Sequence, residues 1–135
     1  MRITLSTIAA LFLSGAVHAE TPASMLRSYV GEAAAASRPY AGASTSAGDR
    51  FFHQRHKDWS CASCHTPDPR RGGSHAVTGK AIQPLAPSVN PARFQDRAKA
   101  DNWFKRNCND TVGRECTAVE KADVLAYLIS LGGAE

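Results

Sequence analysis

The sequence lacks several common patterns, and each absence excludes a class of protein. Beyond residue 19, no run is apolar enough to cross a membrane. The basic residues are scattered and the net charge is only +4, which argues against a nucleic-acid-binding surface. No stretch shows the polar–apolar alternation of a strand, and no internal repeat is present. These absences leave a small, non-repetitive, all-α domain.

The first nineteen residues have the pattern of a secretory signal peptide. Met1 and Arg2 give a positive start, residues 3–17 are largely apolar, and residues 17–19 (Val-His-Ala) fit a small-residue cleavage site. The segment is too short and wrongly flanked for a transmembrane helix. We therefore expect export to the periplasm, with cleavage after Ala19. Disulfides persist in that compartment, so the four cysteines can form bridges or attach a cofactor.

Apolar spacing and capping residues predict a helical chain with one long loop. Residues 34–47 are rich in Ala and Ser and form a linker, whereas residues 66–89 hold four of the seven prolines and are mostly loop. Asn90-Pro91 fits a helix start. The other helices are expected to begin near residues 21, 48, 98 and 118, the last of them behind a Thr-x-x-Glu capping box. Large apolar side chains are few for a domain of this size, so something else must fill the core.

The strongest chemical signal is the run Cys61-Ala-Ser-Cys64-His65, which matches the attachment motif of a c-type haem. The two thiols, three positions apart, can reach the two vinyl groups of one porphyrin, and the adjacent histidine becomes the proximal iron ligand. Chance would place this pattern in about one chain in 250 of this composition. We therefore predict one covalently bound haem c, held by Cys61, Cys64 and His65. A buried porphyrin also supplies the apolar surface that the chain lacks.

Other uses of the cysteine pair are weaker alternatives. A structural zinc site needs a fourth ligand and usually a second closely spaced pair, and the spacing of Cys108 and Cys116 does not provide one. A thioredoxin-like redox site is expected beside a βαβ pattern, which the sequence lacks. A simple disulfide between Cys61 and Cys64 is the third alternative.

With a haem in place, the helices resemble those of class I cytochromes c. Gly48 with Phe52 four residues later, and residues 123–128 (Asp-Val-Leu-Ala-Tyr-Leu), look like the N- and C-terminal helices that cross in that fold. In that family the glycine lets the helices approach, and aromatic residues pack over the crossing. Ordinary core packing accounts for these residues equally well.

The resemblance implies a domain organisation and a partner for the proximal ligand. We expect a signal peptide at 1–19, an N-terminal helix and linker at 20–47, and a class I cytochrome c-like domain at 48–135. This domain is all-α, with the long loop after the attachment motif. In the family, a backbone carbonyl fixes the proximal ring, so Pro84 or a neighbour is expected to accept a hydrogen bond from the far nitrogen of His65.

The chain has no methionine where an electron-carrying class I cytochrome supplies its second axial ligand. Met1 lies in the signal, and Met25 lies well before the motif in an apolar helical face. His53 and His56 lie about one helical turn apart among polar residues, which is typical of a solvated face. His75, in a glycine-rich loop, is the best conventional candidate and would make a bis-histidine electron carrier. The other nitrogen and oxygen donors include Lys80, Lys99, Lys105, Asn102, Asn107 and Asn109.

Four stretches resemble the small family of high-spin, oxygen-binding cytochromes c typified by sphaeroides haem protein. They are residues 60–65 (SCASCH), 78–82 (TGKAI), 84–94 (PLAPSVNPARF) and 103–117 (WFKRNCNDTVGRECT). The last stretch, with an asparagine directly before the first cysteine of a short loop, is the most specific.

This resemblance implies that Asn107 is the distal haem ligand and that Cys108 and Cys116 form a disulfide. Trp103 lies four residues before Asn107, so on a helix both share a face that can lie over the porphyrin. The bridge would pin the end of this helix to the start of the last one and hold a weak ligand near the iron. A simpler role for the bridge is to stabilise a small exported domain.

The implied function is binding of a small diatomic ligand, such as oxygen or nitric oxide, or electron exchange with other cytochromes. The resemblance suggests a dihaem cytochrome c and a membrane cytochrome b as partners. The alternatives are a plain electron carrier with His65 and His75 as ligands, and a haem enzyme such as a peroxidase-like or oxygen-reducing protein. No catalytic acid–base pair can be named from the sequence, so an enzymatic role is the less favoured one.

Overall fold

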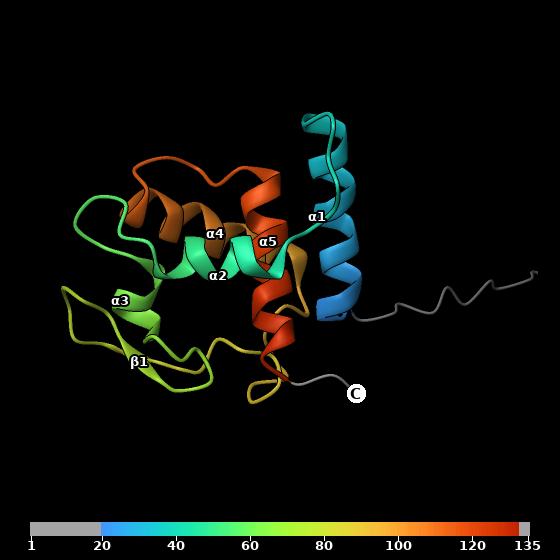
Figure 1. The fold of residues 1–135 in the computed structure, drawn as a ribbon. Helices are drawn as coiled ribbons and strands as arrows, with labels where there is room; N and C mark the ends of the chain where they lie inside the picture. Colours follow the sequence, from blue (N-terminus) through green and yellow to red (C-terminus); the bar gives the residue numbers. More distant parts are fainter. Residues whose placement is uncertain (1–19, 133–135) are drawn as a thin grey trace, which may run out of the picture.

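The computed structural model describes residues 20–132, so the predicted signal peptide (1–19) and residues 133–135 lie outside the described part. The elements follow in the order α1 (Pro22–Ala36), α2 (Thr45–His53), α3 (Cys61–His65), β1 (Gly73–Ser74), β2 (Ala81–Ile82), α4 (Arg97–Thr111) and α5 (Ala118–Ser130). Apart from the short antiparallel pair β1–β2, the described part is all-α, as predicted (Figure 1). No helix in this range has the length and apolar character needed to span a bilayer.

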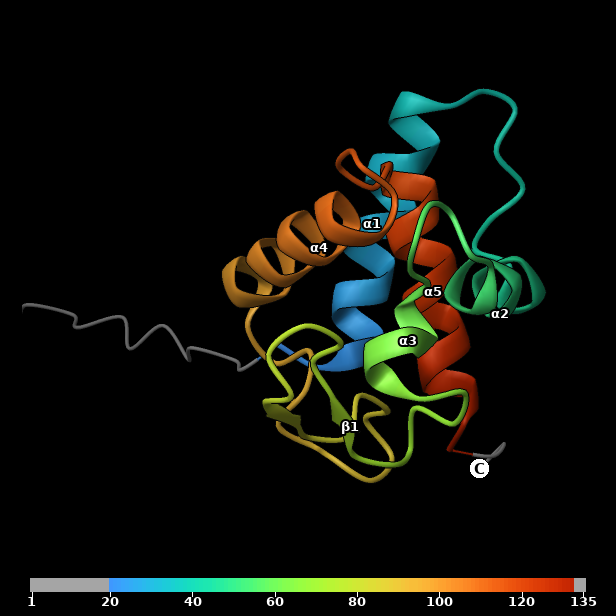
Figure 2. The same cartoon turned by 90° about the vertical axis from the view of Figure 1, so that its left-hand side faces the viewer.

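Helix α5 is the centre of the fold, with α1 packed on one side and α2 crossing it on the other (Figures 1 and 2). The crossing with α2 is close because Gly48 has no side chain: a Cβ atom there would collide with the Asp123 carbonyl group. Asp123 also accepts a hydrogen bond from the Ser44 backbone N–H at 2.7 Å. The predicted role of Gly48 at a helix crossing is confirmed.

The core consists of two clusters along α5. The first is shared with α1 and includes Met25, Tyr29 and Leu125. The second is shared with α2 and consists of Phe52, Val124, Tyr127 and Leu128. Two partly buried phenylalanines, Phe94 and Phe104, pack against both clusters and so join them.

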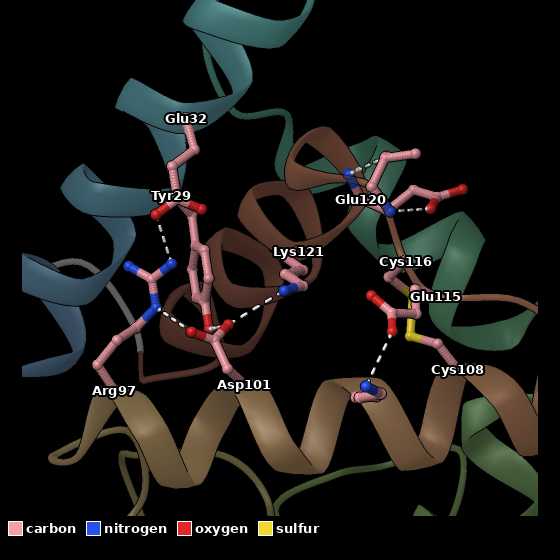
Figure 3. A network of polar contacts seen from close by, with 11 residues as sticks. Tyr29, Glu32, Arg97, Asp101, Cys108, Glu115, Cys116, Glu120 and Lys121 are labelled. Atoms are coloured by element: carbon pink, nitrogen blue, oxygen red, sulfur yellow. Dashed lines mark hydrogen bonds and ion pairs between the residues drawn. A yellow bond between two sulfur atoms is a disulfide. The ribbon is translucent and has the colours of Figure 1, made fainter.

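Helix α4 is anchored near both ends by side chains. Its backbone does not approach another helix as closely as the backbones of α1 and α2 approach α5. Toward its start, the Asp101 carboxylate accepts hydrogen bonds from Tyr29 of α1 at 3.0 Å, from Arg97 at 2.7 Å and from Lys121 of α5 at 3.0 Å (Figure 3). Toward its end, Cys108 is joined by a disulfide to Cys116, just before α5 (Figure 3).

The structure differs from the sequence-based expectation in three places. Helix α2 begins at Thr45 because the Ser44 hydroxyl caps it by accepting from the Ala47 N–H. The predicted helix start at Asn90-Pro91 is wrong, because these residues begin a series of turns. The next helix, α4, starts after its own N-cap residue, Asp96. The pair β1–β2 was not predicted, because strands of two residues are too short to show a period.

Candidate haem-binding site

The attachment motif forms its own short helix, α3. Ser60 precedes it, buried, and its backbone N–H donates to the Ser63 hydroxyl at 2.9 Å. Cys61 and Cys64 are both free thiols and partly buried, one helical turn apart. His65 is the last residue of the helix. The structure thus brings the two thiols and the imidazole together within a single short helix.

The electrostatics of this helix suit metal binding by the histidine. Burial, and secondly the positive charge of Arg93, lower the pKa of His65 to about 4. The ring is therefore neutral near pH 7, and a neutral imidazole has the free nitrogen lone pair that a metal needs. Burial also raises the pKa of the Cys61 thiol to about 11, so it stays protonated at neutral pH until it reacts.

The chain after His65 folds back over α3. Thr66 turns it with a φ of 63°, a conformation that is unusual for a side chain branched at Cβ. Gly73 of β1 then lies so close to α3 that a Cβ atom there would collide with the Cys64 carbonyl oxygen. The Ala76 N–H donates to the Cys64 sulfur at 3.3 Å. The predicted long loop is therefore packed against the attachment helix.

The Pro84 carbonyl has other partners than the one predicted. It accepts hydrogen bonds from Asn90 Nδ2 at 2.9 Å and from Arg93 Nε at 3.0 Å. These two donors occupy both lone pairs of the oxygen, and no hydrogen bond from His65 forms within residues 20–132. The Pro84 carbonyl therefore helps to close its own loop, and a hydrogen bond from the His65 ring to Pro84 or a neighbour stays a prediction. Sequence reasoning missed Arg93, because a lone arginine in a loop carries no pattern.

His53 and His56 have structural partners. His53 Nδ1 lies 2.9 Å from the Asp49 carbonyl oxygen, and Nε2 lies 2.9 Å from the Pro67 carbonyl oxygen. His56 packs its ring on Phe51, with Nε2 3.4 Å from the Phe51 carbonyl oxygen. Both nitrogens of His53 are occupied, and His56 faces its own loop, as expected for residues without a ligand role.

His75 holds the turn between β1 and β2. The ring Nδ1 of His75 lies 3.3 Å from the backbone nitrogens of both Val77 and Thr78. The backbone N–H of His75 donates to the Lys80 carbonyl oxygen at 2.8 Å. A neutral ring whose Nδ1 accepts hydrogen bonds carries its proton on Nε2. In this tautomer His75 offers no free lone pair to iron, so its contacts explain a role in the turn.

The side chain of Asn107, unlike the rings of His53 and His75, has no backbone partner within residues 20–132. Asn107 is partly buried on α4, directly before the disulfide, and its backbone carbonyl accepts from the Thr111 hydroxyl at 2.8 Å. Its side-chain amide makes no hydrogen bond within residues 20–132, whereas the nearby Asn109 amide donates to the Lys105 carbonyl at 2.7 Å. Asn102 of α4 also makes no side-chain hydrogen bond in this range, but it is exposed, so Asn107 is the partly buried asparagine of α4 with an uncommitted amide. Trp103, one turn earlier, is 44% exposed.

The donor set and its surroundings fit a covalently attached haem. The two thiols are free, the imidazole is neutral and the Asn107 amide has no protein partner. Cys108 and Cys116 are consumed by their bridge and offer no thiols for the zinc alternative. Two residues of the attachment motif, Cys61 and Ala62, pack against the second core cluster. Other partly buried apolar side chains pack against the same cluster, among them Phe51, Leu85, Phe94 and Phe104.

Two kinds of sequence comparison identify relatives. A family model described as a domain of unknown function (DUF1924) matches residues 38–128. Cytochrome c'' of Methylophilus methylotrophus is 41% identical over 107 residues, which is 76% of this chain and 74% of that protein. Cytochrome c-type protein SHP of Cereibacter sphaeroides is 54% identical over 69 residues, 51% of this chain and 53% of that protein.

The solved structures agree with these relatives. Oxidized cytochrome c'' from Methylophilus methylotrophus superposes with a TM-score of 0.75 at 38% identity, over 81% of this chain and 93% of that one. Oxidized SHP, described as an oxygen-binding cytochrome c, gives 0.72 at 40% identity, over 82% of this chain and 97% of that one. The chain therefore belongs to the SHP-like family and is a c-type cytochrome of the class I fold with one covalently bound haem.

Proposed function

We propose that this chain is an exported cytochrome in which His65 and Asn107 bind ferric iron, and in which Asn107 gives way to a small diatomic ligand after reduction. The observation that carries the proposal is the contrast among the candidate ligands. His53 and His75 have ring nitrogens engaged by the backbone, and Asn102, Lys80 and Lys99 are exposed, whereas the Asn107 amide is partly buried and makes no hydrogen bond within residues 20–132.

The chemistry of the amide accounts for the exchange. A neutral amide oxygen is a hard, weak donor, so Asn107 binds the more highly charged ferric state better than the ferrous state. The haem supplies an iron that changes by one electron and accepts oxygen, nitric oxide or carbon monoxide when ferrous. Once released, Asn107 can turn its amide N–H₂ toward such a ligand as a hydrogen-bond donor.

The relatives support this proposal. SHP is described as an oxygen-binding cytochrome c. The solution structure of cytochrome c'' is described as giving insights into the structural basis of haem-ligand detachment. By analogy, we propose a reversible distal ligand in this chain too.

The proposal includes a location and partners. Residues 1–19 act as a signal peptide, and the mature protein begins at Glu20 in the periplasm. Its electron partners are other cytochromes, such as a dihaem cytochrome c and a membrane cytochrome b. The intact mass of the exported protein tests the location, since it must equal the chain from Glu20 plus one haem. Reduction of the purified protein by a candidate dihaem cytochrome c tests the partner.

The ligand assignment is tested by spectroscopy of four proteins: wild type, Asn107→Ala, His75→Ala and Asn109→Ala. Absorption and electron paramagnetic resonance report the ferric state, and absorption with and without carbon monoxide reports the ferrous state. We expect Asn107→Ala to alter the ferric spectra, and His75→Ala and Asn109→Ala to leave them unchanged. The ferrous wild type should be high-spin and bind carbon monoxide.

Two outcomes contradict the proposal. One is a ferrous wild type that is low-spin and refuses carbon monoxide; the other is an Asn107→Ala protein with the wild-type ferric spectrum. A ferric spectrum that changes in His75→Ala instead would favour the bis-histidine carrier. Catalytic consumption of oxygen or peroxide by the reduced protein would identify an enzyme.

A further inference from the structure

The indole of Trp103 is a large apolar group that lies in contact with solvent. Trp103 is 44% exposed, whereas its neighbour Phe104 packs against both core clusters. A single exposed aromatic side chain is ordinary on a protein surface, so its meaning depends on what lies beside it.

The residues on either side of Trp103 define its position on α4. The helix turns one face toward the core, and the buried residues of that face are Ala100, Cys108 and Thr111. With about 3.6 residues per turn, Asn107 lies at the border of this face, Trp103 lies further around the helix, and Arg106 lies further still. Burial falls in the same order, from the partly buried Asn107 to the exposed Trp103 and Arg106. Trp103 thus lies between the proposed distal ligand and Arg106.

Arg106 is stacked on Trp103. Its Cζ atom lies over the indole, 4.4 Å from the ring centroid. A guanidinium group is planar and weakly hydrated, and it is attracted to the electron-rich face of an aromatic ring. Within residues 20–132 the Arg106 side chain makes no hydrogen bond and no ion pair, whereas the adjacent Lys105 pairs with Glu115 at 3.3 Å. The indole is therefore the partner of Arg106 in the described part of the chain.

We propose that Arg106 is a positioning residue: by stacking on the outer face of the indole, it holds Trp103 as one wall of the pocket in which a diatomic ligand replaces Asn107. The proposal rests on the proposed function, since the pocket opens only where Asn107 leaves the iron. A wall that is held in place resists the passage of a ligand in both directions. Arg106 therefore controls how fast the ligand enters and leaves, and has little effect on how tightly it binds.

Carbon monoxide binding to the reduced holoprotein tests this role of Arg106. Association is measured after flash photolysis, and dissociation by replacement of carbon monoxide with nitric oxide. We expect Arg106→Gln to raise both rate constants about two- to fivefold, which corresponds to a cation–π contact at an exposed site, and to leave their ratio unchanged. Lys105→Gln is the matched control, because it removes the same charge from the adjacent exposed position. This control should keep the wild-type rates.

A double-mutant cycle shows whether Arg106 acts through Trp103. In a Trp103→Leu background no ring remains for the guanidinium group, so Arg106→Gln should change neither rate constant. A change of the same size in that background would mean that the charge of Arg106 acts on the ligand directly, and it would overturn the proposal. Wild-type rates in Arg106→Gln, or an equal change in Lys105→Gln, would overturn it too.

Nuclear magnetic resonance of the diamagnetic carbon monoxide complex locates Trp103 independently of any rate. If the indole forms a wall of the haem pocket, the porphyrin ring current shifts its Nε1–H resonance away from the value of an exposed indole, and Trp103→Leu identifies the signal by its loss. In Arg106→Gln the shift should shrink, because the indole is no longer held. An unshifted Trp103 resonance in the wild type overturns the proposal. Refusal of carbon monoxide by the ferrous wild type would contradict the proposed function itself, so the two failures are distinguishable.

Discussion

Gly48 of α2 lies directly against the Asp123 backbone of α5, with no room between them for a methyl group. This contact sets the distance between the two helices that carry the second core cluster. The attachment helix α3 packs next to α2, so the crossing also positions the haem-binding residues.

We predict that Gly48→Ala destabilises the protein by about 2–3 kcal/mol, because the added methyl group forces the helices apart. Gly31→Ala is the matched control: Gly31 lies within α1 and an added Cβ would meet nothing within 4 Å. That control should stabilise the protein by about 0.5–1 kcal/mol through helix propensity. Denaturant unfolding of the ferric holoproteins measures both, and equal effects would contradict the close crossing.

Removal of the Cys108–Cys116 disulfide is expected to affect both stability and the distal ligand. The double variant Cys108→Ala/Cys116→Ala should lose about 2.5 kcal/mol, since the bridge closes a short loop in the unfolded chain. Because Asn107 is the neighbour of Cys108, the fraction of ferric protein with Asn107 bound to iron should fall as well. The ferric spectrum would report this change. A loss of stability with an unchanged spectrum would mean that the bridge only stabilises the domain.

Asp101 should make the protein sensitive to acid. Burial opposes its ionisation, but hydrogen bonds from Lys121 and Arg97 outweigh burial and hold its pKa below the usual range. A carboxylate with a depressed folded-state pKa stabilises the protein above its unfolded pKa of about 3.9, and this stabilisation disappears as the pH falls through the lower folded-state value. We therefore expect Asp101→Asn to cost about 1–2 kcal/mol at pH 7, a figure reduced for partial exposure.

Denaturant titrations at pH 7 and near pH 3 check this prediction. The difference between wild type and Asp101→Asn should shrink at the lower pH, because below the unfolded-state pKa the unfolded wild-type chain gains a proton that the folded carboxylate resists. Asp110→Asn, an exposed change on the same helix, should have little effect at either pH. A difference between wild type and Asp101→Asn that stays constant with pH would count against an ionic role.

His53 should make the protein less stable as the pH rises, whereas Asp101 does so as the pH falls. Burial lowers its pKa, but hydrogen bonds to the Pro67 and Asp49 carbonyls, and the charge of Asp49, outweigh burial and raise it. A raised folded-state pKa gives stability that is present below about pH 6.5 and is lost as the pH rises through the higher folded-state value. Wild type should therefore be slightly less stable at pH 8 than at pH 6, and His53→Ala should remove this difference. His56→Ala, which should preserve it, is the control.

Local patterns in the sequence predicted the parts of the fold and site that depend on neighbouring residues. The attachment motif lies on one short helix, the capping box at Thr117 opens α5, and the glycine at position 48 marks a helix crossing. Each of these signals is contained within a few residues of the chain.

Contacts between distant residues could not be predicted in this way. Tyr29 meets Asp101 from 72 positions away, and nothing in either segment indicates the other. The partners of Pro84 depend on how the turns at 90–93 fold back, which no periodicity reports. The free amide of Asn107 is visible only when the partners of the other donors are known.

The disulfide also places a demand on how the protein matures in the cell. Four thiols leave the ribosome, and they allow three ways of forming two bridges. A bridge between Cys108 and Cys116 closes a shorter loop than a bridge from either of them to Cys61 or Cys64 would. Chain entropy therefore favours the pairing of Cys108 with Cys116 over those bridges. The attachment pair, in contrast, must reach the haem vinyl groups as thiols. In the proposed periplasmic location, one pair must therefore be oxidised while a reductant keeps the other reduced, and a failure of that balance would yield apoprotein even from a correctly folded chain.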